Sequence, residues 1–162
     1  MRRLLVCIVA VGLAASSGGG KGSAQACADF QNGGVDAYEP FNQAVSQVDA
    51  TVGTLPIAPS DAVKGQVVAV LSAASSAAER AADDIKALGT PPVELTEPVA
   101  LILTELQAQA DAYSLWSDDY GSQGTSQDAM SQVQALLSEA SSTYDQAYGM
   151  LAANPCSSGA SG

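Results

Sequence analysis

Apolar residues recur three and four positions apart in four long segments of the chain, separated by short stretches containing proline or glycine. This spacing places the apolar side chains on one face of an α-helix. The first segment covers 35–55, with Pro40 in its first turn, where the missing amide hydrogen is tolerated. The second follows Ser60, a favourable N-cap, and ends at Gly89, a favourable residue just beyond a helix.

The third and fourth segments show the same period. The third begins near Thr96, with Pro98 in its first turn, and runs to Tyr120. The fourth begins at Thr125, followed by Asp128 at the spacing of a capping box. Short connections between helices of similar length favour antiparallel neighbours. The predicted fold is therefore all-α, an up-down-up-down antiparallel four-helix bundle.

The N-terminal segment has the organisation of an export signal. A basic start precedes an uncharged apolar run over 4–15, which is shorter than the roughly 20 residues needed to span a bilayer. Cleavage is predicted near Ala15 or after Ala26, and either site removes Cys7. We therefore expect a protein that is secreted or held in the periplasm or cell envelope, with no membrane span in the mature chain.

Three regions follow from this organisation. Residues 1–26 are predicted to be signal peptide and polar leader, 27–156 the helical bundle, and 157–162 a disordered tail. A lipid anchor is not predicted, because Ser16 occupies the position after the apolar run where a lipidated cysteine would stand.

The two remaining cysteines, Cys27 and Cys156, bracket the bundle almost end to end. An even count of cysteines in an oxidising compartment predicts a disulfide. In an up-down-up-down bundle, the start of the first helix and the end of the fourth lie at the same end, so the bridge suits the predicted topology. For so long a loop, the chain-entropy model gives a stabilisation of about 4 to 5 kcal/mol.

Charge narrows the choice of partners. From Cys27 onward, three basic residues stand against all 17 carboxylates, a formal charge of −14. Nucleic acid is excluded as a partner, because binding phosphates requires clustered lysine and arginine. Anionic membrane surfaces are disfavoured for the same reason.

Catalytic motifs are missing from the sequence. The chain has no histidine, which removes the base of a serine or cysteine triad and the histidine ligands of di-iron bundles. Adjacent carboxylates occur at Asp83 and Asp84 and at Asp118 and Asp119, and adjacent residues do not face each other on a helix. We predict a non-enzymatic protein without a metal or cofactor. A carboxylate-based metal site or enzyme is the alternative, if Asp111, Asp118 and Asp128 converge in space.

The middle of the predicted bundle has a small total side-chain volume, and we call it the alanine waist. Its residues are Val45, Leu71, Ala74, Ala78, Leu106, Ala110, Leu137 and Ala140. Its helices can approach until the small residues touch, which gives a dry core and is the usual outcome for alanine. Alternatively, aromatic ends hold the helices apart and leave an apolar cavity. The cavity alternative predicts these ligand-lining residues: Leu71, Ala74, Leu106, Ala110, Tyr113, Trp116, Tyr120, Leu137 and Ala140.

A pattern of residues along the mature chain resembles small secreted, alanine-rich helical-bundle proteins of actinobacteria. It consists of a Cys-x-x-Phe opening at Cys27 and Phe30, a Pro91, Pro92 corner and the closing Cys156. The resemblance implies a secreted helical bundle and assigns no functional residue.

Taken together, these features favour an exported, non-enzymatic bundle that binds a hydrophobic small molecule or a partner at the cell envelope. The alternative is a purely structural or protein-interaction module of the envelope.

Overall fold

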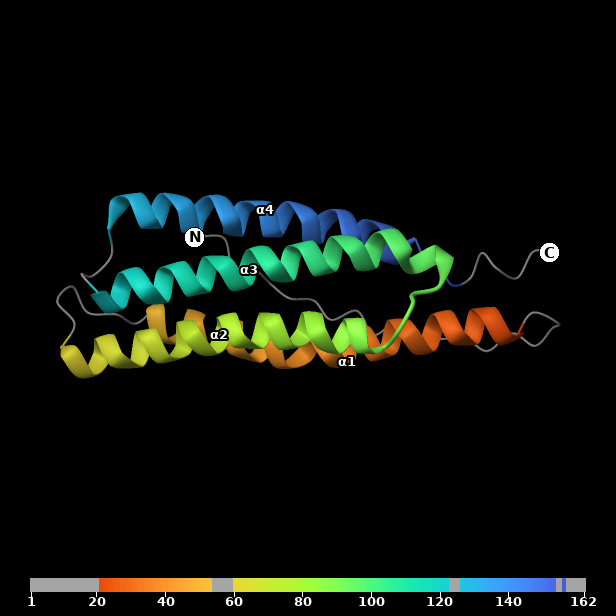
Figure 1. The fold of residues 1–162 in the computed structure, drawn as a ribbon, viewed down its shortest axis with the longest axis horizontal. Helices are drawn as coiled ribbons and strands as arrows, with labels where there is room; N and C mark the ends of the chain where they lie inside the picture. The colour runs from red at the N-terminus through yellow and green to blue at the C-terminus, as the bar shows by residue number, and fades with distance from the viewer. Residues whose placement is uncertain (1–20, 54–59, 123–125, 154–155, 157–162) are drawn as a thin grey trace.

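Four α-helices follow one another along the chain in the computed structural model, which describes residues 21–53, 60–122, 126–153 and 156. Each helix reverses the direction of the one before it, so the prediction of an up-down-up-down antiparallel bundle is confirmed (Figure 1). A short 3-10 helix, η1, precedes the third helix. The elements are α1 (Lys21–Val52), α2 (Asp61–Ala87), η1 (Val93–Leu95), α3 (Thr96–Ser122) and α4 (Gln127–Ala152).

The ends of α2 carry the signals predicted from the sequence. The Ser60 hydroxyl accepts a hydrogen bond from the Val63 amide at 3.4 Å, which satisfies one of the free donors at the helix start. Gly89 follows the last turn with φ of 93°, a left-handed conformation that side chains with a Cβ adopt only at a cost. The connection to α3 therefore starts from a sharply ended helix.

The predicted start of the first helix is wrong, because α1 begins at Lys21 and Pro40 lies in its interior. The residues before 35 lack the apolar period, but Cys27 and Phe30 are buried at the disulfide end. Their packing holds this stretch helical, and Pro40 is accommodated with its ring exposed to solvent. The predicted first-helix residue Leu55 lies outside the described residues.

A glycine allows α1 to approach the end of α2. A Cβ built on Gly33 would lie 2.9 Å from Cδ2 of Leu88, closer than real Cβ atoms come to other atoms. The two helices therefore meet here at a separation that only glycine permits without a shift of the leucine.

The start of α4 also differs from the prediction by one residue. Its N-cap is Ser126, whose hydroxyl accepts a hydrogen bond from the Ala129 amide at 3.2 Å. The predicted cap, Thr125, lies outside the described residues.

The helices pack in the order of the chain. Close backbone packing joins α1 to α2, α2 to α3, and α3 to α4, whereas α1 and α4 do not form such a pair along their described lengths. In Figure 1, α4 lies at the top of the view with α3 below it, and α1 and α2 overlap along the lower edge. Helix α3 is therefore covered on two sides, by α2 and by α4.

The alanine waist is closed where α2 meets α3. Ala74 and Ala78 are fully buried, and the Ser75 hydroxyl donates to the backbone carbonyl of Ala110 at 3.0 Å. One turn away, the hydroxyls of Ser72 and Ser117 share a hydrogen bond of 2.8 Å. Small side chains thus bring these two helices close enough for side chains of one to reach the backbone of the other.

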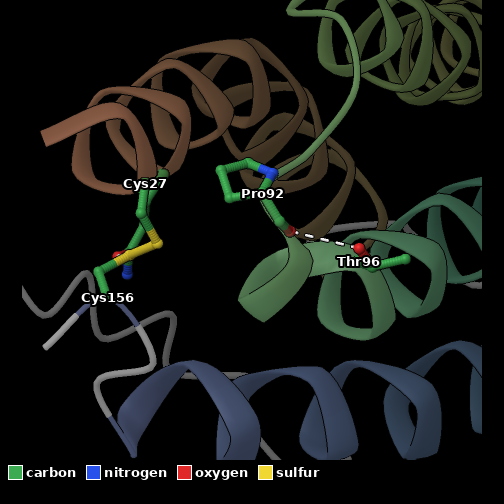
Figure 2. The surroundings of a disulfide bond; sticks show 5 residues. Cys27, Pro92, Thr96 and Cys156 are labelled. Carbon is green, nitrogen blue, oxygen red and sulfur yellow. Dashed lines mark hydrogen bonds between the residues drawn. A yellow bond between two sulfur atoms is a disulfide. The ribbon is translucent and has the colours of Figure 1, made fainter. Parts of the chain in front are cut away.

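A disulfide between Cys27 and Cys156 ties α1 to the chain beyond α4, as predicted, with Cα atoms 5.5 Å apart. Figure 2 shows it beside the start of α3, where the Thr96 hydroxyl donates to the Pro92 carbonyl at 3.3 Å. Leu95 of η1 packs with the two cysteines in a small apolar cluster separate from the main core. The end of the bundle that carries the disulfide therefore has a small hydrophobic core of its own.

None of the described helices is long and apolar enough to cross a membrane. Residues 1–20 and 157–162, which contain most of the predicted signal region and the predicted tail, lie outside the described part of the chain.

Candidate functional site

The predicted ligand-lining residues lie in the interior of the bundle. Trp116 and Leu137 are partly buried, and the other seven are buried: Leu71, Ala74, Leu106, Ala110, Tyr113, Tyr120 and Ala140. Two depressions on the described surface are lined by other, mainly polar residues of α3 and α4. The waist is thus packed at the α2–α3 contact, in line with the usual outcome for alanine.

The buried group that stands out chemically is one that the sequence analysis missed. Glu105 lies in the middle of α3 and is 1% exposed, in a chain whose other carboxylates are mostly on the surface. Charged residues are almost never fully buried unless they are paired. The surroundings of Glu105 therefore define the candidate site.

Hydrogen bonds from two helices hold the Glu105 carboxyl. The Tyr38 hydroxyl, from α1, lies 3.0 Å from both carboxyl oxygens and bridges them. The Gln109 amide, one turn along α3, donates to Oε1 at 2.8 Å. Two donor hydrogens therefore serve a group that offers about four acceptor positions when ionised.

Burial dominates the electrostatics of this carboxyl. Loss of hydration raises the pKa of Glu105 to about 7, although the hydrogen bonds from Gln109 and Tyr38 lower the pKa in part. The group therefore changes its charge close to neutral pH rather than near 4.5, the ordinary value for a glutamate.

Among the described residues from Cys27 onward, no basic side chain is placed to neutralise Glu105. Lys64, Arg80 and Lys86 all lie on α2 and are exposed to solvent. The two lysines pair with acidic residues of their own helix, at 3.7 Å and 3.2 Å, and the Arg80 guanidinium donates to the backbone carbonyl of Ser76. The ionised form of Glu105 thus has hydrogen-bond donors, but none of these three basic side chains serves as its counter-ion.

A row of three tyrosines starts at this carboxyl with Tyr38 of α1, crosses to Tyr144 of α4 and continues along α4 to Tyr148. We call these three residues the tyrosine seam. The ring centroids of Tyr38 and Tyr144 lie 6.3 Å apart, and Tyr144 stacks on Tyr148 at 6.2 Å. Tyr148, 41% exposed, reaches the surface. A row of rings therefore connects the buried carboxyl with solvent, between two helices that do not pack backbone to backbone.

The seam hydroxyls that lie nearest Glu105 are neutral at physiological pH. Burial raises the pKa of both Tyr38 and Tyr144, and the nearby Glu105 charge raises each further. Tyr113, on the same helix as Glu105, has its pKa raised by burial as well. Glu105 is consequently the group in this cluster that titrates near pH 7.

A weak signal for Glu105 is present in the sequence. Alongside the apolar stripe through Leu106, α3 has a second buried stripe made of Pro98, Glu105, Ala108 and Ala112. Its members are mostly small, so it does not stand out as hydrophobic. The position of Glu105 in this stripe indicates burial only if α3 is covered on two faces, and the sequence does not show that it is.

The other carboxylates singled out from the sequence do not form a centre. Asp111, Asp118 and Asp128 are exposed, and the described residues contain no group of three acidic or cysteine side chains suited to a metal ion. Asp119 has a structural partner: its carboxylate accepts from the Ser126 amide at 2.6 Å and from the Ser126 hydroxyl at 2.8 Å. It thereby supports the start of α4 across the turn.

No protein-family model, curated protein or solved structure matches this chain. The fold defines an all-α, disulfide-linked four-helix bundle, and the site is a buried carboxyl beneath a tyrosine seam.

Proposed function

We propose that this protein is an exported, non-enzymatic binding protein that takes up a small, largely apolar molecule between α1 and α4. The observation that carries the proposal is the construction of this one helix pair. Its backbones do not pack closely along their described lengths, and Tyr38 meets Tyr144 across it with ring centroids 6.3 Å apart, whereas the pairs α1–α2, α2–α3 and α3–α4 pack closely along their backbones.

An interface built from side chains can open with little loss of backbone packing. Separating α2 from α3 would break the Ser75 bond to the Ala110 carbonyl and expose fully buried alanines. Separating α1 from α4 would part Tyr38 from Tyr144 without breaking close backbone packing, and their ring faces then offer apolar surface to a ligand. The tyrosine seam is therefore better suited to admit a molecule than the alanine waist.

The disulfide limits how far the seam can open. Cys27 and Cys156 hold α1 and the end of α4 together at one end of the bundle, which leaves the remainder of the seam free to part. The disulfide also fits an oxidising compartment outside the cytoplasm. Together with the signal-like residues 1–26, it supports the proposed export to the periplasm, the envelope or the medium.

Native mass spectrometry of the protein purified from its own host tests this function. We expect a fraction of the protein to carry a small molecule that is lost on denaturation. A bare polypeptide mass, combined with no binding of the neutral apolar dye N-phenyl-1-naphthylamine, would rule out the ligand function and favour the structural or interaction module instead.

Two variants locate the dye within the bundle. Tyr144→Ala removes a ring of the seam and should weaken binding of the dye about tenfold, equivalent to about 1.4 kcal/mol. Trp116→Phe changes the aromatic cluster on which the sequence-based cavity prediction relied, and should leave binding unchanged. The opposite pattern would move the site to that cluster and refute the seam.

A further inference from the structure

An apolar ligand gives no reason for a buried carboxyl group, that of Glu105, at the end of the tyrosine seam. We propose that the ligand of the tyrosine seam is an organic cation, an ammonium group carrying an apolar substituent, with Glu105 as its counter-ion and the seam tyrosines as its aromatic walls. This inference rests on the proposed function and names the chemical class of its ligand.

The first argument is the missing partner of a buried charge. Glu105 is 1% exposed, and the three basic side chains of the mature chain are exposed on α2. A carboxylate in such surroundings is strongly disfavoured unless a cation compensates it. Because none of these three side chains provides such a cation, a ligand that brings one would gain the full interaction with the carboxylate.

The second argument is the incomplete set of donors. Tyr38 offers one hydrogen between the two carboxyl oxygens, and Gln109 offers one to Oε1. An ionised carboxylate has further acceptor positions to fill. The Tyr38 hydroxyl occupies the position between the two oxygens that a single cation would favour, so we expect its ring to move aside when the ligand enters.

The third argument is the aromatic path. Tyr38, Tyr144 and Tyr148 lead from the carboxyl to the surface with successive ring centroids 6.3 Å and 6.2 Å apart. Ammonium groups are attracted to the faces of such rings. The formal charge of −14 on the mature chain also attracts cations over the whole surface and repels anions.

The charge state of the site makes cation binding depend on pH. The titratable groups that face Glu105 are Tyr38 from α1, Tyr144 from α4 and Tyr113 from its own helix, all with pKa values raised by burial. The charged residues of α2 at 79, 80, 83 and 84 are exposed. Below neutral pH, the cation must therefore displace the proton of Glu105, which is released to solvent while the ammonium keeps its own.

The test compares 3-phenylpropylammonium with 3-phenylpropanol, which differ in the charged group and little in shape. The amine stays protonated between about pH 5.5 and about pH 8.5. Isothermal titration at about pH 8 should show the amine binding at least about tenfold more tightly than the alcohol. Below about pH 7, the affinity for the amine should fall about tenfold per pH unit, while that for the alcohol stays constant.

Variants assign the effect to the buried carboxyl. Glu105→Gln should abolish the preference for the amine, whereas Glu97→Gln, which removes an exposed charge from the same helix, should retain it. Titration at about pH 6 in buffers of different ionisation enthalpy should show nearly one proton released per amine in the wild type and none in Glu105→Gln. Tyr38→Phe should shift the pH dependence upward, because the carboxylate loses a hydrogen bond.

The outcomes separate the two proposals. Equal affinity for the amine and the alcohol, both reduced by Tyr144→Ala, would overturn the cation inference and leave an apolar-ligand function standing. Preference for the amine that survives Glu105→Gln would place the charge recognition elsewhere and also overturn it. If neither compound binds and the native mass is bare, the proposed function fails and the inference fails with it.

Discussion

Replacing Glu105 with glutamine removes a negative charge from the interior of the bundle while it keeps the size of the side chain. The amide oxygen can still accept from the Tyr38 hydroxyl, and Gln109 can turn its own amide to complete the second hydrogen bond. The variant therefore isolates the effect of the buried charge on the stability of the fold.

The size of this effect follows from the two pKa values. Glu105 has a pKa of about 7 in the folded protein and an ordinary value of 4.5. Between these values the folded state binds more protons than the unfolded state, so stability is lost as pH rises. At about 1.4 kcal/mol for each pKa unit, the loss reaches about 3 kcal/mol above pH 7. Below about pH 4.5 the penalty vanishes, because both states are protonated.

Urea unfolding with the disulfide intact measures the difference between wild type and Glu105→Gln. We expect nearly equal free energies of unfolding at about pH 4.5, and a variant more stable by about 3 kcal/mol at about pH 8. Taking the difference cancels the titration of the other carboxylates. Glu97→Gln should show no comparable dependence on pH. If the Glu105→Gln difference is flat between these pH values, the carboxyl does not titrate near neutrality and the reasoning is refuted.

Three further predictions concern the scaffold. Intact mass before and after reduction should reveal one disulfide, and alkylation of both thiols without reduction would contradict it. Removing the disulfide with Cys27→Ser and Cys156→Ser should lower the free energy of unfolding by up to about 4 to 5 kcal/mol. Ala74→Leu should destabilise by about 1 to 3 kcal/mol by overfilling the α2–α3 contact, and a neutral result in urea unfolding would indicate spare room there. Asp119→Ala should cost about 1 kcal/mol through the loss of support for α4, while the exposed Asp118→Ala serves as a near-neutral control; equal losses in thermal unfolding would argue against this role.

Local signals predicted most of the helix positions. Ser60 and Gly89 mark the ends of α2 because capping depends on a few neighbouring residues and their backbone conformation. Local signals gave the wrong start for α1. A proline is normally found in the first turn of a helix, but Pro40 lies inside α1, because burial of Cys27 and Phe30 keeps the preceding residues helical. The predicted start of α4 was also one residue away from the observed N-cap, Ser126. The carboxylate that supports Ser126 comes from Asp119 in the preceding helix, which a local capping pattern does not include.

The candidate site was harder to foresee than the fold. The ligand-lining prediction placed an apolar cavity at the alanine waist and the aromatic residues beside it, between helices held apart by aromatic ends. The structure instead brings α2 and α3 together through small residues and bridges α1 and α4 with tyrosines. Helix periodicity identifies a buried face but carries no information on the distance to the helix opposite.

The sequence by itself determined four helices, an acidic chain, and a pair of cysteines whose positions suit one end of an even-numbered bundle. These features follow from the composition, from the spacing of apolar residues within one or two helical turns, and from the positions of the cysteines in the chain. Only the tertiary structure decided that α3 is covered by both α2 and α4, and hence that Glu105 is buried. Burial depends on how many neighbours surround a helix. A glutamate next to a buried leucine is expected to be exposed on a helix with one covered face. On a helix with two covered faces, as in α3, the same glutamate can be buried.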